Sequence, residues 1–305
     1  MTALPVMIFH QGNPRYLKKV MRQANAWNDQ VWLLGDHTNQ ECAVNWVDST
    51  AIQSRMFEQF LEVYEHMSTR SRQAEMFCFE SHFKYYEFAR RMGWNRFVTM
   101  DSDVLVYHRF DKMEFGNVDA AFGWTDGRID ERAWACDPFV TYWTIEAMEE
   151  FLLFCIQIYK EDPSLLKQKW AYHREKQVSG GICDMTLFWL WRNRTTRKIY
   201  NLAQEKDGKV YDLIVNSPDN AREGEYCFSK WKNMKVVRFR EGVPYLKRSD
   251  GQWVQANVLH CNGHHKQYIG LLQRCSNMAL EYVAVNWLVK GKIAVKRGLK
   301  KFWGK

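Results

Sequence analysis

The chain lacks closely spaced cysteine pairs. Its eight cysteines are spread over 305 residues, and no two of them form a C-x-x-C pair. Neither a zinc ribbon nor a disulfide-stapled scaffold is indicated, because both depend on short, repeated cysteine spacings. Several cysteines lie in apolar stretches, such as Cys155 within residues 151–156. We therefore expect free thiols in a reducing compartment.

Targeting and membrane-crossing segments are also missing. The first ten residues have no basic leader and too short an apolar run for a signal peptide, and no later stretch is long enough to span a bilayer. The chain has no internal repeat and no low-complexity linker. These absences lead us to expect a cytoplasmic protein.

Positive charge is concentrated at one end of the chain. The net charge is +8, but residues 290–305 contain seven Lys or Arg and no acid, so the preceding residues carry only about +1. This distribution argues against a nucleic-acid groove across the body of the protein. We expect one large domain over residues 1–285 and a basic tail over residues 286–305.

The tail has an amphipathic pattern. In a helix from Trp287 onward, one side is apolar and another is basic, and the basic side carries Lys296, Arg297, Lys300 and Lys301. Such a segment is typical of peripheral binding to an anionic membrane surface. A frayed basic end that only aids solubility is the alternative.

The order of elements predicts an α/β fold. Residues 5–9 and 30–36 are expected to form short strands on either side of a helix over residues 15–27. A strand, helix and strand in that order indicate a parallel sheet. Further helices are expected over residues 51–66, 74–92 and 145–159, further strands over 97–100 and 119–124, and short strands and loops over 200–254.

Two aspartates follow a buried strand. The triplet Asp101-Ser102-Asp103 comes directly after the apolar residues 97–100. It is therefore expected at the carboxyl end of a strand, where open α/β sheets bind ligands. Two carboxylates there provide oxygen ligands for Mn²⁺ or Mg²⁺, which would neutralise a diphosphate. The alternative is a solvated acidic turn, but the apolar flanks disfavour unpaired charge.

A second polar group lies far downstream. His260 follows the short apolar run Val258-Leu259, and Gly263 and Lys266 come shortly after it. His260 is our candidate for a third metal ligand, although a lone histidine at a strand end is more often an ordinary polar residue. Gly263 would let the backbone approach a phosphate, and Lys266 would supply a positive charge.

Together these residues resemble a known family. The D-x-D of Asp101 and Asp103 with the H-x-x-G-x-x-K of His260, Gly263 and Lys266 is similar to the GT-A-fold glycosyltransferases, in particular family 8. The resemblance implies a Rossmann-like, mostly parallel sheet flanked by helices, with Mn²⁺ or Mg²⁺ bound by Asp101, Asp103 and His260. It also implies transfer of a sugar from a nucleotide-sugar donor, by default a UDP-sugar, to a glycan or lipid-linked acceptor.

The resemblance adds donor-binding candidates. Lys84 lies on the helix before the D-x-D, where family members tend to carry a basic residue that binds the donor. Asp36 ends the second strand and resembles the acid that contacts the nucleotide base or ribose, with His10, Gln11 and Ser102 as further donor-binding candidates. An ordinary helix lysine and a turn aspartate are the alternatives for Lys84 and Asp36.

Asp184 is the candidate catalytic residue. It follows a glycine turn at residues 180–181 and resembles the family's acid that contacts the transferred sugar near the reacting carbon. The alternative is a simple helix cap. Family 8 enzymes retain the anomeric configuration, so retention is favoured. The next residue is usually Gln in the family but is Met185 here, which leaves open an inverting enzyme with Asp184 as general base.

Aromatic residues make up 15% of the chain. Trp124, Trp134 and Trp143 are candidates for stacking on the sugar rings of an acceptor. Core packing is the commoner role of a tryptophan, so both interpretations are kept.

Two other functions compete with sugar transfer. Residues 101–105 also resemble the haloacid-dehalogenase phosphatase signature, in which Asp101 would be the phosphorylated nucleophile. Leu105 departs from the Thr or Val expected there, and that signature usually follows the first strand of the fold. The third possibility is a membrane-associated sugar-binding protein that has lost turnover.

Overall fold

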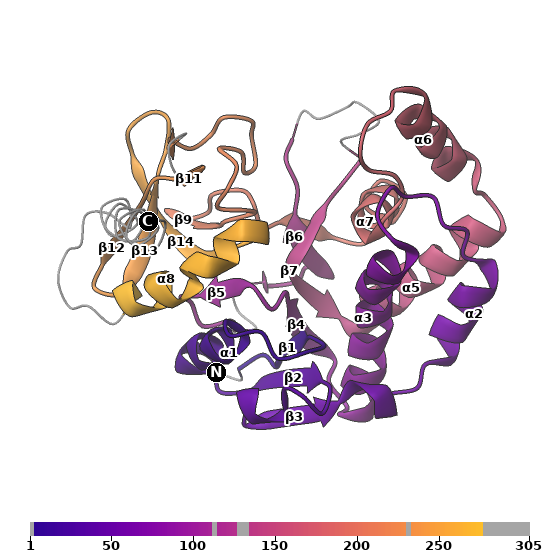
Figure 1. Cartoon of the computed structure of the whole chain (residues 1–305), viewed down its shortest axis with the longest axis horizontal. Coiled ribbons are helices and arrows are strands. Elements are labelled where there is room, and N and C mark those ends of the chain that lie inside the picture. Colours follow the sequence, from indigo (N-terminus) through magenta and orange to yellow (C-terminus); the bar gives the residue numbers. More distant parts are fainter. Residues whose placement is uncertain (1–2, 112–114, 127–133, 230–232, 277–305) are drawn as a thin grey trace, which may run out of the picture. The chain divides into compact units, whose positions relative to one another are not determined.

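The structure is a computed structural model that describes residues 3–111, 115–126, 134–229 and 233–276 (Figure 1). The chain forms two compact units. The first unit consists of Met1–Pro14, Asn28–Ser102 and Arg109–Leu202, and the second of Arg15–Trp27, Asp103–His108 and the chain from Ala203 onward. No linker marks these boundaries in the sequence, because each unit is assembled from separate segments. The predicted tail, residues 286–305, lies outside the described residues.

The first unit contains a seven-stranded sheet. Six strands run parallel to one another and one, β7, runs antiparallel to both of its neighbours. The predicted α/β class with a mostly parallel sheet is therefore confirmed. In order across the sheet the strands are β3 (Asn45–Asp48), β2 (Val31–Gly35), β1 (Val6–Phe9), β4 (Arg96–Met100), β7 (Asp137–Thr144), β6 (Ala120–Gly123) and β8 (Ile199–Asn201).

Three helices of the first unit begin at side-chain caps. The hydroxyl of Ser54 accepts the N–H of Phe57, that of Ser71 accepts the N–H of Ala74, and Thr144 caps the next long helix in the same way. Each bond satisfies an N–H group that the helix itself leaves unpaired. The helices are α2 (Arg55–Val63), α3 (Arg72–Arg91), α5 (Ile145–Lys160), α6 (Ser164–Glu175) and α7 (Asp184–Arg192), with short 3₁₀ turns η1 (Gln40–Cys42) and η2 (Ser49–Ala51).

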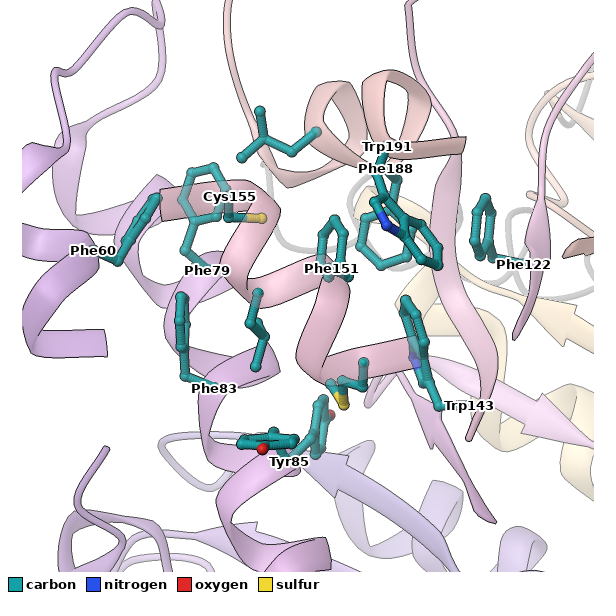
Figure 2. Packing of buried hydrophobic residues seen from close by; sticks show 14 of the residues in the cluster. Phe60, Phe79, Phe83, Tyr85, Phe122, Trp143, Phe151, Cys155, Phe188 and Trp191 are labelled. Atoms are coloured by element: carbon teal, nitrogen blue, oxygen red, sulfur yellow. The ribbon is translucent and has the colours of Figure 1, made fainter. Parts of the chain in front are cut away.

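Aromatic side chains fill the core of the first unit. Rings from α3, α5 and α7 pack together in Figure 2. The ring of Phe151 on α5 lies 4.4 Å from that of Phe188 on α7 and 5.6 Å from that of Trp143, measured between centroids. Burying one such side chain stabilises the fold by about 1.5–3 kcal/mol. This core fixes the positions of α3 and α7, and α7 begins with Asp184.

The second unit is built on antiparallel strands. The order is β12-β13-β14-β5, and β9 pairs in parallel with β14. Helix α1 packs on β5 and α8, with Gln23 donating to the carbonyl of Val106 at 2.9 Å. The strands are β5 (Val104–Val106), β9 (Lys209–Tyr211), β10 (Phe228–Ser229), β11 (Met234–Lys235), β12 (Val237–Arg240), β13 (Val243–Lys247) and β14 (Trp253–His260), and the helices are α1 (Leu17–Trp27), η4 (Gly263–Tyr268) and α8 (Ile269–Ser276).

Several elements differ from the expectations. Strand β7 and helix α6 were not predicted. Five consecutive residues of β7 are buried, so the strand shows no alternation of period two, and the residues that α6 buries are Leu166, Lys169 and His173, so its buried side is mostly polar. The predicted helix over residues 51–66 is shorter and follows the η2 turn. None of the helices in the described part of the chain is long and apolar enough to cross a membrane.

Candidate functional site

The D-x-D is the connection between two strands. β4 ends at Met100, the N–H of Asp101 donates to the carbonyl of Phe139 at 2.8 Å, and β5 begins at Val104. The boundary between the two compact units falls between Ser102 and Asp103. The triplet therefore follows a strand, as its apolar flanks predicted, and its two carboxylates are assigned to different units.

In the second unit, Asp103 meets two residues of the downstream motif. Antiparallel pairing of β5 with β14 sets Val104 opposite His260, so the preceding residue, Asp103, reaches the end of β14. His260 Nε2 is 3.4 Å from one Asp103 carboxylate oxygen, and Lys266 Nζ is 3.1 Å from the other. Two short motifs that are distant in the sequence are thus brought together by the pairing of two strands.

The charges of this cluster support one another. Burial acts to raise the pKa of Asp103, but the hydrogen bond and charge of His260, together with Lys266, outweigh it and hold that pKa below its usual value. Burial acts to lower the pKa of Lys266, yet Asp103 and Tyr16 raise it overall. Asp103 is therefore a carboxylate and Lys266 an ammonium at neutral pH.

The orientation of His260 suits a metal ligand. Its Nδ1 lies 2.6 Å from the carbonyl oxygen of Leu213, so Nδ1 carries the proton and donates it. Nε2 is then the nitrogen that faces the carboxylate of Asp103, where it can either carry a second proton, as the hydrogen bond that lowers the pKa of Asp103 requires, or present a lone pair to a cation. Two lone pairs at that distance repel unless a proton or a cation lies between them. In histidines that bind metals, the N–H of the other ring nitrogen characteristically donates to a carbonyl or carboxylate oxygen in this way.

Asp101 completes a set of possible metal ligands. Asp101, Asp103 and His260 are a group of carboxylate and imidazole side chains of the kind that holds a metal ion. Asp101 is exposed and belongs to the first unit. The chain itself keeps it close to Asp103, because two residues span at most about 7 Å.

Polar residues gather where β1, β2 and β4 end in the first unit. Ser102 Oγ lies 2.8 Å from His10 Nδ1, and the amide of Asn39 donates to the His10 carbonyl at 2.8 Å. Asp36 accepts the N–H of Gly12 at 2.6 Å. The predicted donor residues His10, Asp36 and Ser102 therefore lie on neighbouring strand ends, and Gln11 is exposed in the loop between β1 and α1.

Hydrogen bonds keep Asp36 ionised. Burial acts to raise its pKa, but bonds from Thr38 and from the N–H of Gly12 lower it below its usual value. A permanent carboxylate at the end of β2 is a suitable acceptor for hydroxyl groups of a ligand.

Lys84 is already engaged in structural bonds. Its Nζ donates to the carbonyl of Ser49 at 2.9 Å and to the carbonyl of Ile52, and it lies 3.3 Å from Glu80 Oε1. The side chain is buried. Lys84 therefore ties α3 to the η2 turn, whereas its predicted contact with the donor stays a prediction.

Asp184 has a partner that the sequence did not single out. One carboxylate oxygen lies 3.0 Å from His82 Nε2 on α3, and the other accepts the N–H of Met185 at 2.9 Å. Both side chains are buried, and His82 Nδ1 is a buried atom without a hydrogen-bond partner. A signal was present, because His82 shares the core-facing side of α3 with Phe79, Phe83 and Tyr86.

The negative charge of Asp184 affects the thiol of Cys78 on α3. Burial raises the pKa of its thiol far above the usual value, the carboxylate of Asp184 raises it further, and Asp101 also contributes. Arg70 partly offsets these effects. Asp184 and Asp101 therefore both act on the same stretch of α3 within the first unit.

The three tryptophans have different surroundings. Trp143 is fully buried in the core, which agrees with core packing and not with an acceptor contact. Trp124 lies under the guanidinium of Arg192, 4.0 Å from its ring centroid. Trp134 is partly exposed and stacks on Trp189 with ring centroids 5.1 Å apart.

Comparison with known proteins gives distant structural likenesses. No family model matches the chain, and no curated protein sequence matches it. Among solved structures, mouse xyloside xylosyltransferase 1 in its apo form is similar over 65% of this chain and 84% of its own, with 10% identity and a TM-score of 0.42. The apo structure of the bifunctional glycosyltransferase WbbM is similar over 70% of this chain and 40% of its own, with 13% identity and a TM-score of 0.40.

A third similar structure is a glycosyltransferase involved in glycosylation of the major capsid of PBCV-1. It is similar over 88% of this chain and 99% of its own, with 9% identity and a TM-score of 0.39. At such identities and TM-scores, the function of this chain has to be argued from its own residues.

Proposed function

We propose that this chain is a divalent-metal-dependent GT-A-type glycosyltransferase, related in its motifs to family 8, that transfers a sugar from a UDP-sugar to a glycan or lipid-linked acceptor. The observation that carries the proposal is the side-chain cluster at the end of β14. There, a histidine with its proton on Nδ1 directs Nε2 toward a buried carboxylate, which also pairs with a lysine. Such a cluster can hold a cation and a phosphate side by side.

The residues have distinct proposed roles. Asp101, Asp103 and His260 would hold Mn²⁺ or Mg²⁺, which when bound would neutralise charge on the departing diphosphate. Lys266 adds a second positive charge for the same group. Gly263 has a φ of +56° at the start of η4, a backbone conformation that favours glycine.

The first unit would bind the remainder of the donor. Asp36, with its ionised carboxylate, is proposed to accept hydroxyl groups of the ribose or to contact the base. His10, Gln11 and Ser102 line the neighbouring strand ends, and the bonds of His10 to Ser102 and to the Asn39 amide hold this loop in place. Lys84 is proposed to support the same region from α3.

Asp184 is proposed to contact the transferred sugar. His82 donates to one of its oxygens and the N–H of Met185 to the other, so the carboxylate is held in a fixed orientation. Retention of anomeric configuration is our proposal by resemblance. If the enzyme inverts instead, Asp184 would take a proton from the acceptor hydroxyl as general base.

The phosphatase alternative has weaker support. The D-x-D follows β4, which is the fourth strand of the chain and not the first. Asp103 is occupied by His260 and Lys266, an arrangement that the phosphatase signature does not require.

The proposal is tested by donor binding and hydrolysis with the full chain. A panel of UDP-, GDP- and ADP-linked sugars is titrated with and without Mn²⁺. We expect divalent-dependent hydrolysis of one donor without acceptor, abolished by EDTA and reduced about 10²–10³-fold in Asp103→Asn, as for loss of an electrostatic group at a reacting centre. Asp29→Asn, which alters an exposed aspartate paired with Arg109, is the matched control.

The outcomes separate the alternatives. Failure to bind any nucleotide sugar, with or without Mn²⁺, would contradict the proposal. Donor binding without hydrolysis or transfer would support the non-catalytic sugar-binding protein. Hydrolysis of a generic phosphoester would favour the phosphatase.

A further inference from the structure

A fully buried ion pair lies in the second unit close to His260. Lys235 Nζ is 2.6 Å from Asp212 Oδ1, and both side chains have 0% exposure. Lys235 also donates to Asn220 Oδ1 at 3.2 Å and lies 5.2 Å from the ring centroid of Tyr226. A buried ion pair is weak evidence of stabilisation, since apolar residues of similar size often serve as well. Its position therefore requires another explanation.

The ion pair is connected to His260 at two points. Asp212 Oδ2 accepts the backbone N–H of His260 at 3.2 Å. The carbonyl of the next residue, Leu213, accepts the proton of His260 Nδ1 at 2.6 Å. The N–H of Leu213 in turn donates to Asn220 Oδ1 at 2.8 Å, and this is the oxygen that Lys235 contacts.

We propose that Asp212 is a positioning residue for His260 and that Lys235 is the buried counter-charge of Asp212, an inference that rests on the proposed metal site. Asp212 holds the backbone of His260, and the network around Asn220 fixes the Leu213 carbonyl that keeps the ring proton on Nδ1. Nε2 is thereby kept as the nitrogen that binds the cation. Because Lys235 neutralises Asp212, the network orients the imidazole of His260 without placing a net charge next to it.

Two double variants of the full chain test this inference. Asp212→Ala/Lys235→Met removes both charges and also the oxygen that accepts the His260 N–H. Asp212→Asn/Lys235→Met removes both charges but keeps such an oxygen. Neither variant leaves one buried ion without its partner, which is the change that most damages folding.

The measurement is Mn²⁺ binding by isothermal titration calorimetry, without a donor. We expect the dissociation constant to rise about 10–100-fold in Asp212→Ala/Lys235→Met, as for loss of groups that orient metal ligands. In Asp212→Asn/Lys235→Met we expect a change of less than about threefold, because the oxygen that orients His260 is kept.

Leu246→Ala serves as the stability control. Leu246 is fully buried on β13, and its apolar side chain cannot hydrogen-bond with His260. Its truncation should lower the melting temperature through lost packing, while Mn²⁺ affinity stays unchanged. Equal affinity in all variants would overturn the inference. Absence of Mn²⁺ binding in the unmodified chain would instead overturn the metal site, and the inference with it.

A second measurement is made on the unmodified chain, and a variant is needed only to assign the signal. Two-bond ¹H–¹⁵N spectra of the unmodified, metal-free chain report which ring nitrogens are protonated, and His260→Gln identifies the signal. The network requires a proton on Nδ1 of His260. A neutral ring with its proton on Nε2 would overturn the inference.

Discussion

His82 sets the orientation of Asp184 through one hydrogen bond between two buried side chains. The carboxylate stands at the first position of α7, where the helix N-terminus also favours negative charge. Loss of the imidazole would leave one buried carboxylate oxygen without its donor. A variant that keeps a donor at this position therefore separates the orienting role of His82 from its contribution to packing.

We predict that His82→Ala lowers kcat for transfer or donor hydrolysis by about 10–100-fold, because Asp184, the group proposed to act at the reacting centre, loses the hydrogen bond that orients it. The KM for the donor should change little. His82→Gln, which keeps an N–H donor at a similar reach, should restore most of kcat. Equal losses in kcat for both variants, with no rescue, would contradict a positioning role.

Single residues also show what could be inferred before the structure was known. Asp101 and Asp103 were identifiable because two carboxylates at a strand end are poor structural material, and His260 and Lys266 because their motif resembles that of a known family. Their meeting was not derivable from the residues alone, since it depends on Val104 lying opposite His260. His82 and Asp212 were missed because hydrogen bonds such as the one between His82 and Asp184 join positions 102 residues apart.

At the scale of elements, α3 connects the core to the proposed donor site. Its apolar side packs in the aromatic cluster of Figure 2, while Lys84 reaches the η2 turn and His82 reaches α7. The helix was predicted from the sequence because its aromatic residues recur at helical spacing. The polar contacts of α3 could not be predicted from the sequence, because they depend on which elements lie beside the helix.

We predict that Lys84→Met lowers the free energy of unfolding by about 1–3 kcal/mol, because two carbonyls lose their buried donor. Urea denaturation of the full chain measures this effect. Lys160→Met, at the exposed end of α5, is the control and should have little effect. An unchanged stability together with a large rise in donor KM would instead assign Lys84 to donor binding alone.

Several strands of the first unit could be located from the sequence, but the direction of β7 could not be predicted. β1, β2 and β4 were predicted because each is a short apolar run with polar residues after it. β7 runs antiparallel to both neighbours, and no local pattern distinguishes that direction from a parallel one.

At the scale of the whole molecule, the uneven charge remains the most distinctive feature. Seven basic residues and no acid lie within residues 290–305, outside the described residues. Peripheral attachment to an anionic membrane surface, which would bring the protein to a lipid-linked acceptor, is therefore a prediction from the sequence.

We predict that replacing Lys296, Arg297, Lys300 and Lys301 by Gln weakens binding to vesicles containing phosphatidylserine. Each basic residue near such a surface contributes about 1 kcal/mol, so the loss should reach up to about 10³-fold and diminish at high salt. Co-sedimentation with anionic and neutral vesicles measures it. Equal binding of both chains to anionic vesicles would contradict the role of the tail, and replacing Lys18 and Arg22 by Gln is a charge control.

The sequence by itself determined the α/β class, the strand ends at which polar residues lie, and the chemical types of the proposed metal ligands. These follow from local properties, namely apolar periodicity and the energetic penalty of placing carboxylates beside buried strands. Only the tertiary structure decided that Asp103 meets His260, that His82 holds Asp184, and that a buried Lys235–Asp212 pair lies close to His260. These contacts join distant segments, so they are fixed by strand register and core packing and not by any local preference.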